Sequence, residues 1–215
     1  MSYQIEKGTT LGVACLGITH PHTSGRVKAF KRMADVQFLG AYDDSPLLAP
    51  FCDALELQQR SKEEILVAVM NNGIQEVIDG GERALAHYDA PADRLAALFR
   101  VHMWSMLQGA GGDAMNALVY EWRSLSAPSQ SAVKALSDRY EAMWQSVVAD
   151  AVQTGLIQGD ARVIKRCVLG AMNLTVQWYK PGGRLAPAAF IDAMLLASLP
   201  ALPEGAGAWP LDAAA

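Results

Sequence analysis

Few residue types that could perform chemistry occur in this chain, and most of them stand alone. His20 and His22 could be a metal-binding pair, but no third ligand follows at a suitable spacing, so we expect two turn histidines instead. Three cysteines are scattered without a CxxC motif and are expected to be buried, reduced thiols: Cys15, Cys52 and Cys167. No Ser-His-Asp order or Cys-His pair stands out. The sequence therefore predicts no catalytic residue and no metal site, and an enzyme is the less favoured interpretation.

A second group of side chains could line a pocket for an apolar molecule. His102 lies on the apolar side of a predicted helix without a nucleophile as partner, so we expect it in a pocket wall or core. The other members are aromatic or methionine residues, which form plain core more often than pocket walls. The candidate set is His102, Met103, Trp104, Tyr120, Trp122, Tyr140, Met143 and Trp144. Arg123 and Arg139 could meet an acidic effector, or pair with Glu121 and Asp138 on the helix surface.

Composition excludes several classes of protein. The chain has 215 residues, is 51% hydrophobic and 19% charged, and carries a net charge of −4. That balance is typical of a protein with a sizeable core and argues against both disorder and a strong electrostatic footprint for nucleic acid. Neither a secretory signal nor a long uncharged apolar segment is recognisable, so we expect a cytoplasmic protein without a membrane span.

The pattern of predicted elements changes near Arg60. Before it, apolar runs at 11–18 and 36–42 read as buried strands, and a helix is expected from Thr23 or Ser24 to about Met33. Asp43 and Asp44 follow the second run. Ser45 is expected to cap a further helix that begins at Pro46. Strand, helix, strand and acidic pair form the beginning of a nucleotide-binding βαβ unit.

Residues 11–57 resemble the first βαβ of the Gfo/Idh/MocA oxidoreductases. The resemblance implies an NAD(P) site in which Gly17 is the first glycine of the phosphate-binding turn and Asp43 contacts the ribose. Thr19 and His22 stand where the motif has its other glycines, and the family's Glu-Lys-Pro motif is absent. A lone carboxylate after a strand also serves as a cap or turn residue. An NAD(P)-dependent oxidoreductase fragment is therefore kept as the alternative; otherwise no cofactor is expected.

Everything after Arg60 reads as helix. Ser61 and Glu64 form a capping box, and Pro91, Asp113 and Asp160 are expected at the starts of later helices. The predicted helices span about 61–88, 91–108, 113–123, 129–156, 160–178 and 187–199. The tail, rich in Ala, Pro and Gly, is expected to be frayed from Pro200 onwards.

Four motifs in this helical part resemble the C-terminal domain of TetR-type regulators. They are Ser61-Lys62-Glu63-Glu64-Ile65-Leu66, Glu121-Trp122-Arg123-Ser124-Leu125, Asp138-Arg139-Tyr140 and Trp178-Tyr179-Lys180-Pro181-Gly182-Gly183-Arg184-Leu185. The resemblance implies a homodimer held by the last two helices and a pocket for a mainly apolar effector, such as a fatty or aromatic acid or an acyl thioester. The implied interface residues are Ile164, Val168, Ala171, Leu174, Trp178, Phe190, Met194 and Leu195.

A TetR-type protein carries a helix-turn-helix just ahead of this domain, and here the nucleotide-binding fragment takes its place. The sequence thus predicts a mainly α protein with a TetR-type C-terminal helical bundle and a small, incomplete Rossmann-like βαβ segment. Its expected parts are 1–60, 61–200 and a flexible tail at 201–215. We expect an effector-binding, dimerising regulator domain whose direct DNA binding is doubtful. A rearranged gene product without a selected function remains a further alternative.

Overall fold

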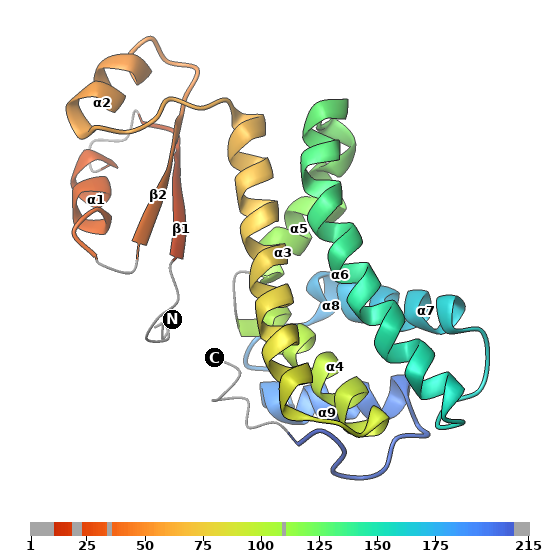
Figure 1. Cartoon of the computed structure of the whole chain (residues 1–215). Coiled ribbons are helices and arrows are strands. Elements are labelled where there is room, and N and C mark those ends of the chain that lie inside the picture. Colours follow the sequence, from red (N-terminus) through yellow and green to blue (C-terminus); the bar gives the residue numbers. More distant parts are fainter. Residues whose placement is uncertain (1–10, 19–22, 34–35, 109–110, 209–215) are drawn as a thin grey trace.

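The protein is mainly helical, as Figure 1 shows for the computed structural model. The structure describes residues 11–18, 23–33, 36–108 and 111–208. Helices α3 to α9 form the larger part, and two strands with two short helices lie beside the N-terminal end of α3 (Figure 1). The predicted helical class is therefore confirmed, and the sheet that accompanies it is small.

The sheet has two parallel strands, β1 (Leu11–Leu16) and β2 (Val36–Tyr42), with helix α1 (Thr23–Phe30) between them in the chain. The register shifts where Ala14 pairs with Gly40, whose φ is +138°. A Cβ on Gly40 would lie 2.8 Å from the carbonyl oxygen of Gln58. Glycine is thus required for the close approach of residues 58–60, where Arg60 N donates to the Ala41 carbonyl at 3.0 Å.

Helix α2 (Leu48–Leu55) begins later than predicted. Ser45 is not its N-cap but part of the turn that precedes it: the Ser45 amide donates to Oδ1 of Asp43 at 2.7 Å, and Ser45 Oγ accepts the Leu47 amide at 3.2 Å. The N-cap residue is Leu47, which makes no side-chain capping bond. Lys31 donates from Nζ to the Leu55 carbonyl at 2.6 Å and so joins the end of α1 to the end of α2.

Helix α3 (Lys62–His87) begins at the predicted capping box, which the structure confirms. Ser61 Oγ accepts the Glu64 amide at 3.2 Å, and Glu64 Oε2 accepts the Ser61 amide at 2.7 Å. A Cβ on Gly81 would lie 2.8 Å from the Met143 sulfur and 2.9 Å from Leu98 Cδ1. The absence of a side chain at Gly81 therefore brings α3 close to the helices that carry Leu98 and Met143.

The remaining helices follow most of the predicted boundaries. They are α4 (Pro91–Gln108), α5 (Gly111–Glu121), the 3-10 turn η1 (Trp122–Ser124), α6 (Ala127–Gln153), α7 (Ala161–Asn173), α8 (Thr175–Trp178) and α9 (Pro187–Ser198). Asp160 caps α7 as predicted by accepting the amides of Arg162 and Val163. Two predictions are wrong: α5 begins at Gly111 rather than at an Asp113 cap, and the helix after Asp160 ends at Asn173 instead of continuing to Trp178.

Two apolar clusters make up the core of the helical part. The larger one joins α4, α6, α7 and α9 and centres on Phe99, Trp144, Met172 and Ile191. The smaller one joins α3 to α6 and to Leu125 after η1. The side chains of Tyr140 and Met143 pack against both clusters. Within the described ranges, no helix combines the length and apolarity that a bilayer crossing requires.

The segment after α9 packs on α4, so the prediction of a frayed tail is wrong for residues 201–208. Leu202 and Ala206 are buried in the larger cluster. Arg100 donates to the Gly207 carbonyl at 2.7 Å, and Asp93 Oδ1 accepts the Gly207 amide, also at 2.7 Å. Polar groups of α4 therefore hold this segment from both sides; residues 209–215 lie outside the described ranges.

Candidate functional site

Four polar side chains from three helices meet inside the apolar core of the helical part. His102 projects from α4, Tyr140 and Trp144 stand one turn apart on α6, and Asn173 is the last residue of α7. The His102 ring centroid lies 5.8 Å from that of Tyr140 and 6.2 Å from that of Trp144. We call these four residues the polar cluster.

One strong hydrogen bond joins the polar cluster. His102 Nδ1 and Tyr140 Oη are 2.5 Å apart, and the two rings are nearly parallel, at 13°. Burial lowers the pKa of His102 to about 4, an effect that the nearby Asn173 side chain partly offsets. Burial also raises the pKa of Tyr140 well above its usual value. Both groups are therefore neutral near pH 7, so the hydrogen bond joins an uncharged hydroxyl to an uncharged imidazole.

The Asn173 side chain also approaches His102, and Trp144 approaches Tyr140, closely enough to shift the pKa of each. Three other polar atoms of the cluster nevertheless lack a hydrogen bond of normal geometry among the described residues. They are His102 Nε2, Trp144 Nε1 and Asn173 Oδ1. Leaving a buried donor or acceptor unpaired costs about 1–3 kcal/mol, so native proteins rarely keep several in one place without a purpose. Such a concentration marks a place where a bound molecule could supply the missing partners.

The structure brings only part of the predicted pocket set together. His102 and Trp144 are almost fully buried in the polar cluster, with Tyr140 beside them. Met103 and Met143 pack in the surrounding core, and Trp104 packs on its edge. Two members do not belong to this site: the Trp122 side chain packs in the smaller cluster, and the Tyr120 side chain is 64% exposed on α5.

Asn173 was not among the predicted site residues. A signal was available, because Asn173 and Thr175 are polar positions within an apolar helical stripe. Thr175 satisfies itself by donating to the Met172 carbonyl at 2.6 Å. Asn173 keeps its side-chain oxygen unpaired, so it is the polar residue of α7 that is available to a ligand.

The residues predicted for a dimer interface divide into two groups. Ala171, Leu174 and Trp178 are exposed, with 48% of Leu174 and 52% of Trp178 accessible. Val168 and Leu195 are each only 4% exposed and belong to the chain's own core, which excludes them from contact with a second copy. The prediction is therefore wrong for these two residues.

Ile164, Phe190 and Met194 are intermediate, since they pack on the edge of the core. Phe190 contacts Trp178 edge to face at a centroid distance of 5.5 Å, which joins α9 to α8. Val163 and Leu196, which were not predicted, are 59% and 55% exposed. Val163 shares one side of α7 with Ala171 and Leu174, so a continuous apolar surface reaches from α7 to Trp178.

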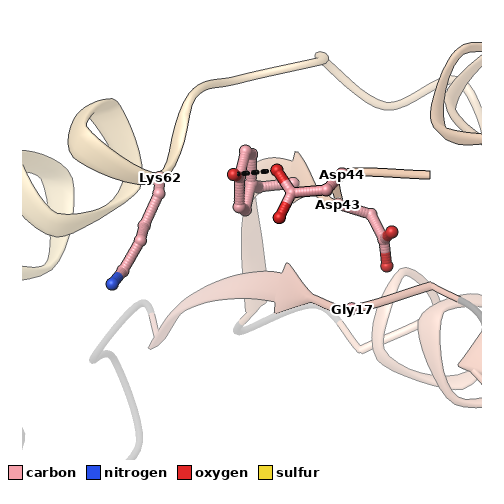
Figure 2. A pocket seen from close by; sticks show the side chains of 5 residues that line it. Gly17, Asp43, Asp44 and Lys62 are labelled. Carbon is pink, nitrogen blue, oxygen red and sulfur yellow. Dashed lines mark hydrogen bonds between the residues drawn. The ribbon is translucent and has the colours of Figure 1, made fainter. Parts of the chain in front are cut away.

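A shallow hollow of about 280 Å³ lies at the carboxyl ends of the two strands. Gly17, Tyr42, Asp43, Asp44 and Lys62 line it, and Figure 2 shows Lys62 at the start of α3 with its amino group directed away from Asp43 and Asp44. This is the edge of the sheet at which the Gfo/Idh/MocA resemblance implies a nucleotide. The residues Thr19 and His22 of that expected site lie outside the described ranges.

The side chains of this hollow do not fit a dinucleotide well. Asp43 accepts the Ile18 amide on Oδ2 at 2.6 Å and the Ser45 amide on Oδ1, so both of its oxygens hold the two strand ends together. Asp44 accepts the Tyr42 hydroxyl (Figure 2). Two carboxylates and one lysine would repel a pyrophosphate more than they attract it. Asp43 therefore serves as a turn residue in this structure, and the described lining residues offer a pyrophosphate little attraction; an NAD(P) site stays the alternative that the sequence left open.

Metal binding has no support in the described part of the chain. No group of three or more His, Cys, Asp or Glu residues is close enough to hold an ion there. His20 and His22 lie outside the described ranges. The cysteines that were expected to be buried thiols divide: Cys52 is buried, Cys15 is half-buried and Cys167 is exposed.

Comparisons with known proteins agree with this architecture. The sequence profile of the family described as "Tetracyclin repressor-like, C-terminal domain" matches residues 88–200, which is more than half of the chain. A solved structure described as superantigen PfiT is 30% identical, with 83% of this chain and 97% of that chain covered and a TM-score of 0.59. No curated protein sequence matches the chain.

Two structures of regulators share the fold at lower identity. AibR, solved in complex with isovaleryl coenzyme A and operator DNA, is 23% identical over 70% of this chain and 85% of its own, with a TM-score of 0.60. The TetR family transcriptional regulator PfmR from Thermus thermophilus is 21% identical over 86% and 100% of the two chains, also with a TM-score of 0.60. The resemblance of the helical part to TetR-type regulators is confirmed, and the chain belongs to the family of tetracyclin repressor-like C-terminal domains.

Proposed function

We propose that the chain is the effector-sensing and dimerising part of a TetR-type regulator, and that its effector is a mainly apolar small molecule. The observation that carries this proposal is the polar cluster, in which unpaired polar atoms converge within an otherwise apolar core. Small-molecule sites have this composition, with apolar walls and a few polar anchors. AibR, which shares the fold, is described with an acyl thioester bound, so the fold can accept a ligand of this kind.

The proposed ligand would enter between α4, α6 and α7, the helices that supply the polar cluster. Met103 and Met143 would form part of the apolar wall, because unbranched methionine side chains can rearrange around a ligand. Gly81 lies beside Met143, so a shift of that side chain would also reach α3. An effector that moved Met143 would therefore also affect α3, in addition to the helices that the effector contacts directly.

The test is a thermal-shift and calorimetric screen of medium-chain alcohols, ketones, amides and acids. We expect ligands that raise Tm in the wild-type protein to lose their effect in Tyr140→Phe. Tyr120→Phe is the matched control, because the Tyr120 hydroxyl is exposed on α5 and should leave the shift unchanged. Equal Tm shifts in the two variants would show that the ligands bind elsewhere.

We also propose that the functional unit is a homodimer held by the apolar surface of α7 and α8. Val163, Leu174 and Trp178 each expose about half of their area there. Large apolar side chains that cluster on one surface commonly mark an interface between subunits. A second copy is the favoured occupant because the same surface on both subunits can pair about a twofold axis.

DNA reading by this chain itself is not part of the proposal. The described elements ahead of α3 include two parallel strands, whereas a helix-turn-helix is built from helices alone. A gel-shift experiment with the DNA around the gene is expected to give only weak, non-specific complexes. A sequence-specific complex that weakens steeply with salt would overturn this part of the proposal. A dimer that binds no small molecule would instead favour a rearranged chain without a selected function.

A further inference from the structure

From the polar cluster and the charges around it, we infer that the recognised group of the effector is uncharged: a carbonyl-containing headgroup, such as an amide, that bridges His102 and Asn173. This inference rests on the proposed effector site and narrows the chemical class of its ligand. It excludes the free fatty or aromatic acids that the sequence left open and favours their neutral derivatives.

The donors and acceptors of the polar cluster can be assigned from its geometry. Tyr140 Oη has one proton to give, and His102 Nδ1 at 2.5 Å is its partner. With the Tyr140 proton directed at Nδ1, His102 carries its own proton on Nε2, which is then a free donor. Asn173 Oδ1 is a free acceptor. One donor and one acceptor from facing helices match a primary or secondary amide, which offers a carbonyl oxygen and an N–H.

The cluster offers no positive charge to a carboxylate. Burial keeps His102 neutral at pH 7, as its lowered pKa shows. The less exposed cations of the helical part are engaged elsewhere: Arg94 with the Leu85 and Tyr88 carbonyls, Arg100 with Asp192, and Lys165 with Glu141. A carboxylate brought into this core would lose its hydration and could gain only a protonated His102 as its counter-ion, a charge state that burial of the imidazole disfavours.

Arg123 and Arg139, the two cations that the sequence offered to an acidic effector, do not change this conclusion. Arg139 pairs with Glu82 at 2.5 Å, and both side chains are about half exposed. Arg123 is exposed on η1. Both arginines therefore lie at the surface, as in the simpler interpretation of these residues.

The formal charge that does approach this region is negative. Ser105, one helical turn beyond His102 on α4, donates to Glu76 Oε1 at 3.0 Å. The Glu76 carboxylate belongs to α3 and reaches α4 at Ser105, where it would disfavour an anionic headgroup. It could attract an ammonium group, so a cationic ligand is the rival that the experiment must address.

Three probes with one shared tail separate these possibilities: octanamide, octanoate and octylammonium, titrated calorimetrically at pH 7.5. We expect octanamide to bind at least tenfold more tightly than either ion. Octanoate or octylammonium binding as tightly as octanamide would overturn the inference while leaving the effector site intact. Failure of all three probes to bind would count against the proposed function itself.

Variants then locate the headgroup. Asn173→Leu is expected to lower octanamide affinity about tenfold or more while leaving the weak binding of octanoate unchanged. Tyr120→Phe is the control and should change neither affinity. Should Asn173→Leu fail to fold, the wild-type imidazole ¹⁵N spectrum decides: octanamide must shift the Nε2 resonance of His102, and an unchanged resonance in the saturated protein contradicts the assignment.

Discussion

The Tyr140 hydroxyl and Nδ1 of His102 form a 2.5 Å hydrogen bond that joins α6 to α4 in the interior of the helical part. Both side chains are neutral there, because burial lowers the pKa of His102 and raises that of Tyr140. The bond therefore adds no net charge to the core, and its loss would leave a buried imidazole nitrogen unpaired. The stability of the chain and its response to pH are therefore expected to depend on this pair.

The first prediction concerns Tyr140→Phe. Removing the hydroxyl leaves His102 Nδ1 without its partner, which should lower the free energy of unfolding by about 1–3 kcal/mol. Urea denaturation measures the change. Tyr120→Phe removes the same atom from a side chain that is 64% exposed and should change stability by less than about 0.5 kcal/mol. Equal losses in the two variants would mean that the buried bond contributes nothing.

The second prediction is a loss of stability in mild acid that His102 causes. Its pKa is about 4 in the folded chain and 6.5 as the ordinary value, so between these pH values the unfolded state binds more protons than the folded state. The contribution of neutral His102 to the free energy of unfolding is therefore complete above about pH 6.5. It is lost as the pH falls toward 4, and the loss is at most about 3 kcal/mol.

Denaturation curves between pH 7 and pH 5 test this prediction. His102→Gln is the comparison, since glutamine can accept the Tyr140 proton and does not titrate. Between pH 7 and pH 5 the free energy of unfolding of the wild-type protein should fall by about 2 kcal/mol more than that of this variant. Parallel pH profiles for the two proteins would show that another group is responsible.

The third prediction is that Leu174→Glu with Trp178→Glu yields monomers. Both side chains are about half exposed on the apolar surface of α7 and α8, where a charge would oppose pairing with a second copy. Light scattering after size exclusion should give a dimer mass for the wild type and a monomer mass for the double variant.

Leu47→Glu serves as the surface control, because Leu47 is 60% exposed at the start of α2 and should leave the dimer intact. Leu195, which the sequence placed among the interface residues, is unsuitable for such a substitution. Leu195 is 4% exposed in the core, so a glutamate there would unfold the chain whether or not it dimerises. A double variant that stays dimeric would move the interface away from α7 and α8.

The fourth prediction compares two glycines after α9. Both have positive φ, +53° at Gly207 and +78° at Gly205. A Cβ on Gly207 would collide with the Asp93 carbonyl oxygen, whereas nothing lies within 4 Å of one on Gly205. Gly205→Ala should therefore lower the free energy of unfolding by about 1 kcal/mol, because of backbone strain. Gly207→Ala should lower it by about 2 kcal/mol or more, because the segment must also move away from α4. Equal losses in thermal unfolding would contradict the close packing.

The fifth prediction is that NADH fluorescence does not change when the protein is titrated into it. Asp43 holds the Ile18 and Ser45 amides, and Asp44 adds a second carboxylate to the hollow at the strand ends. Saturable NADH binding that Lys62→Ala abolishes would revive the oxidoreductase alternative. Asp43→Ala is a poor probe, since it would also release the two turns that Asp43 connects.

Sequence reasoning succeeded where a boundary depends on neighbouring residues. The Ser61–Glu64 capping box, Pro91 at the start of α4 and the Asp160 cap all act within one helical turn, so local spacing was sufficient to locate them. Ser45 Oγ accepts the Leu47 amide as a capping residue would, but it closes a turn, and α2 begins only at Leu48.

Distant contacts explain the larger errors. An apolar stripe on α7 and α9 shows that a surface is buried, but not whether the chain's own core or a second copy covers it. In the structure, Val168 and Leu195 are buried in the chain's own core. The segment after α9 carries weak local preferences and is held by Arg100 and Asp93, about a hundred residues earlier. Asn173 became part of the candidate site only because α7 ends beside His102.

Helix α3 runs unbroken for 26 residues, which makes it a rod about 39 Å long. One end contacts the two strands, and the far end, near Gly81, touches Met143 and Leu98 beside the core. A tilt of about 5° at the Gly81 end would carry the opposite end through roughly 3 Å, the arc that follows from that length. The strands ahead of Ser61 are therefore joined to the core by one continuous helix, and a rearrangement around Met143 that tilted α3 would also displace them.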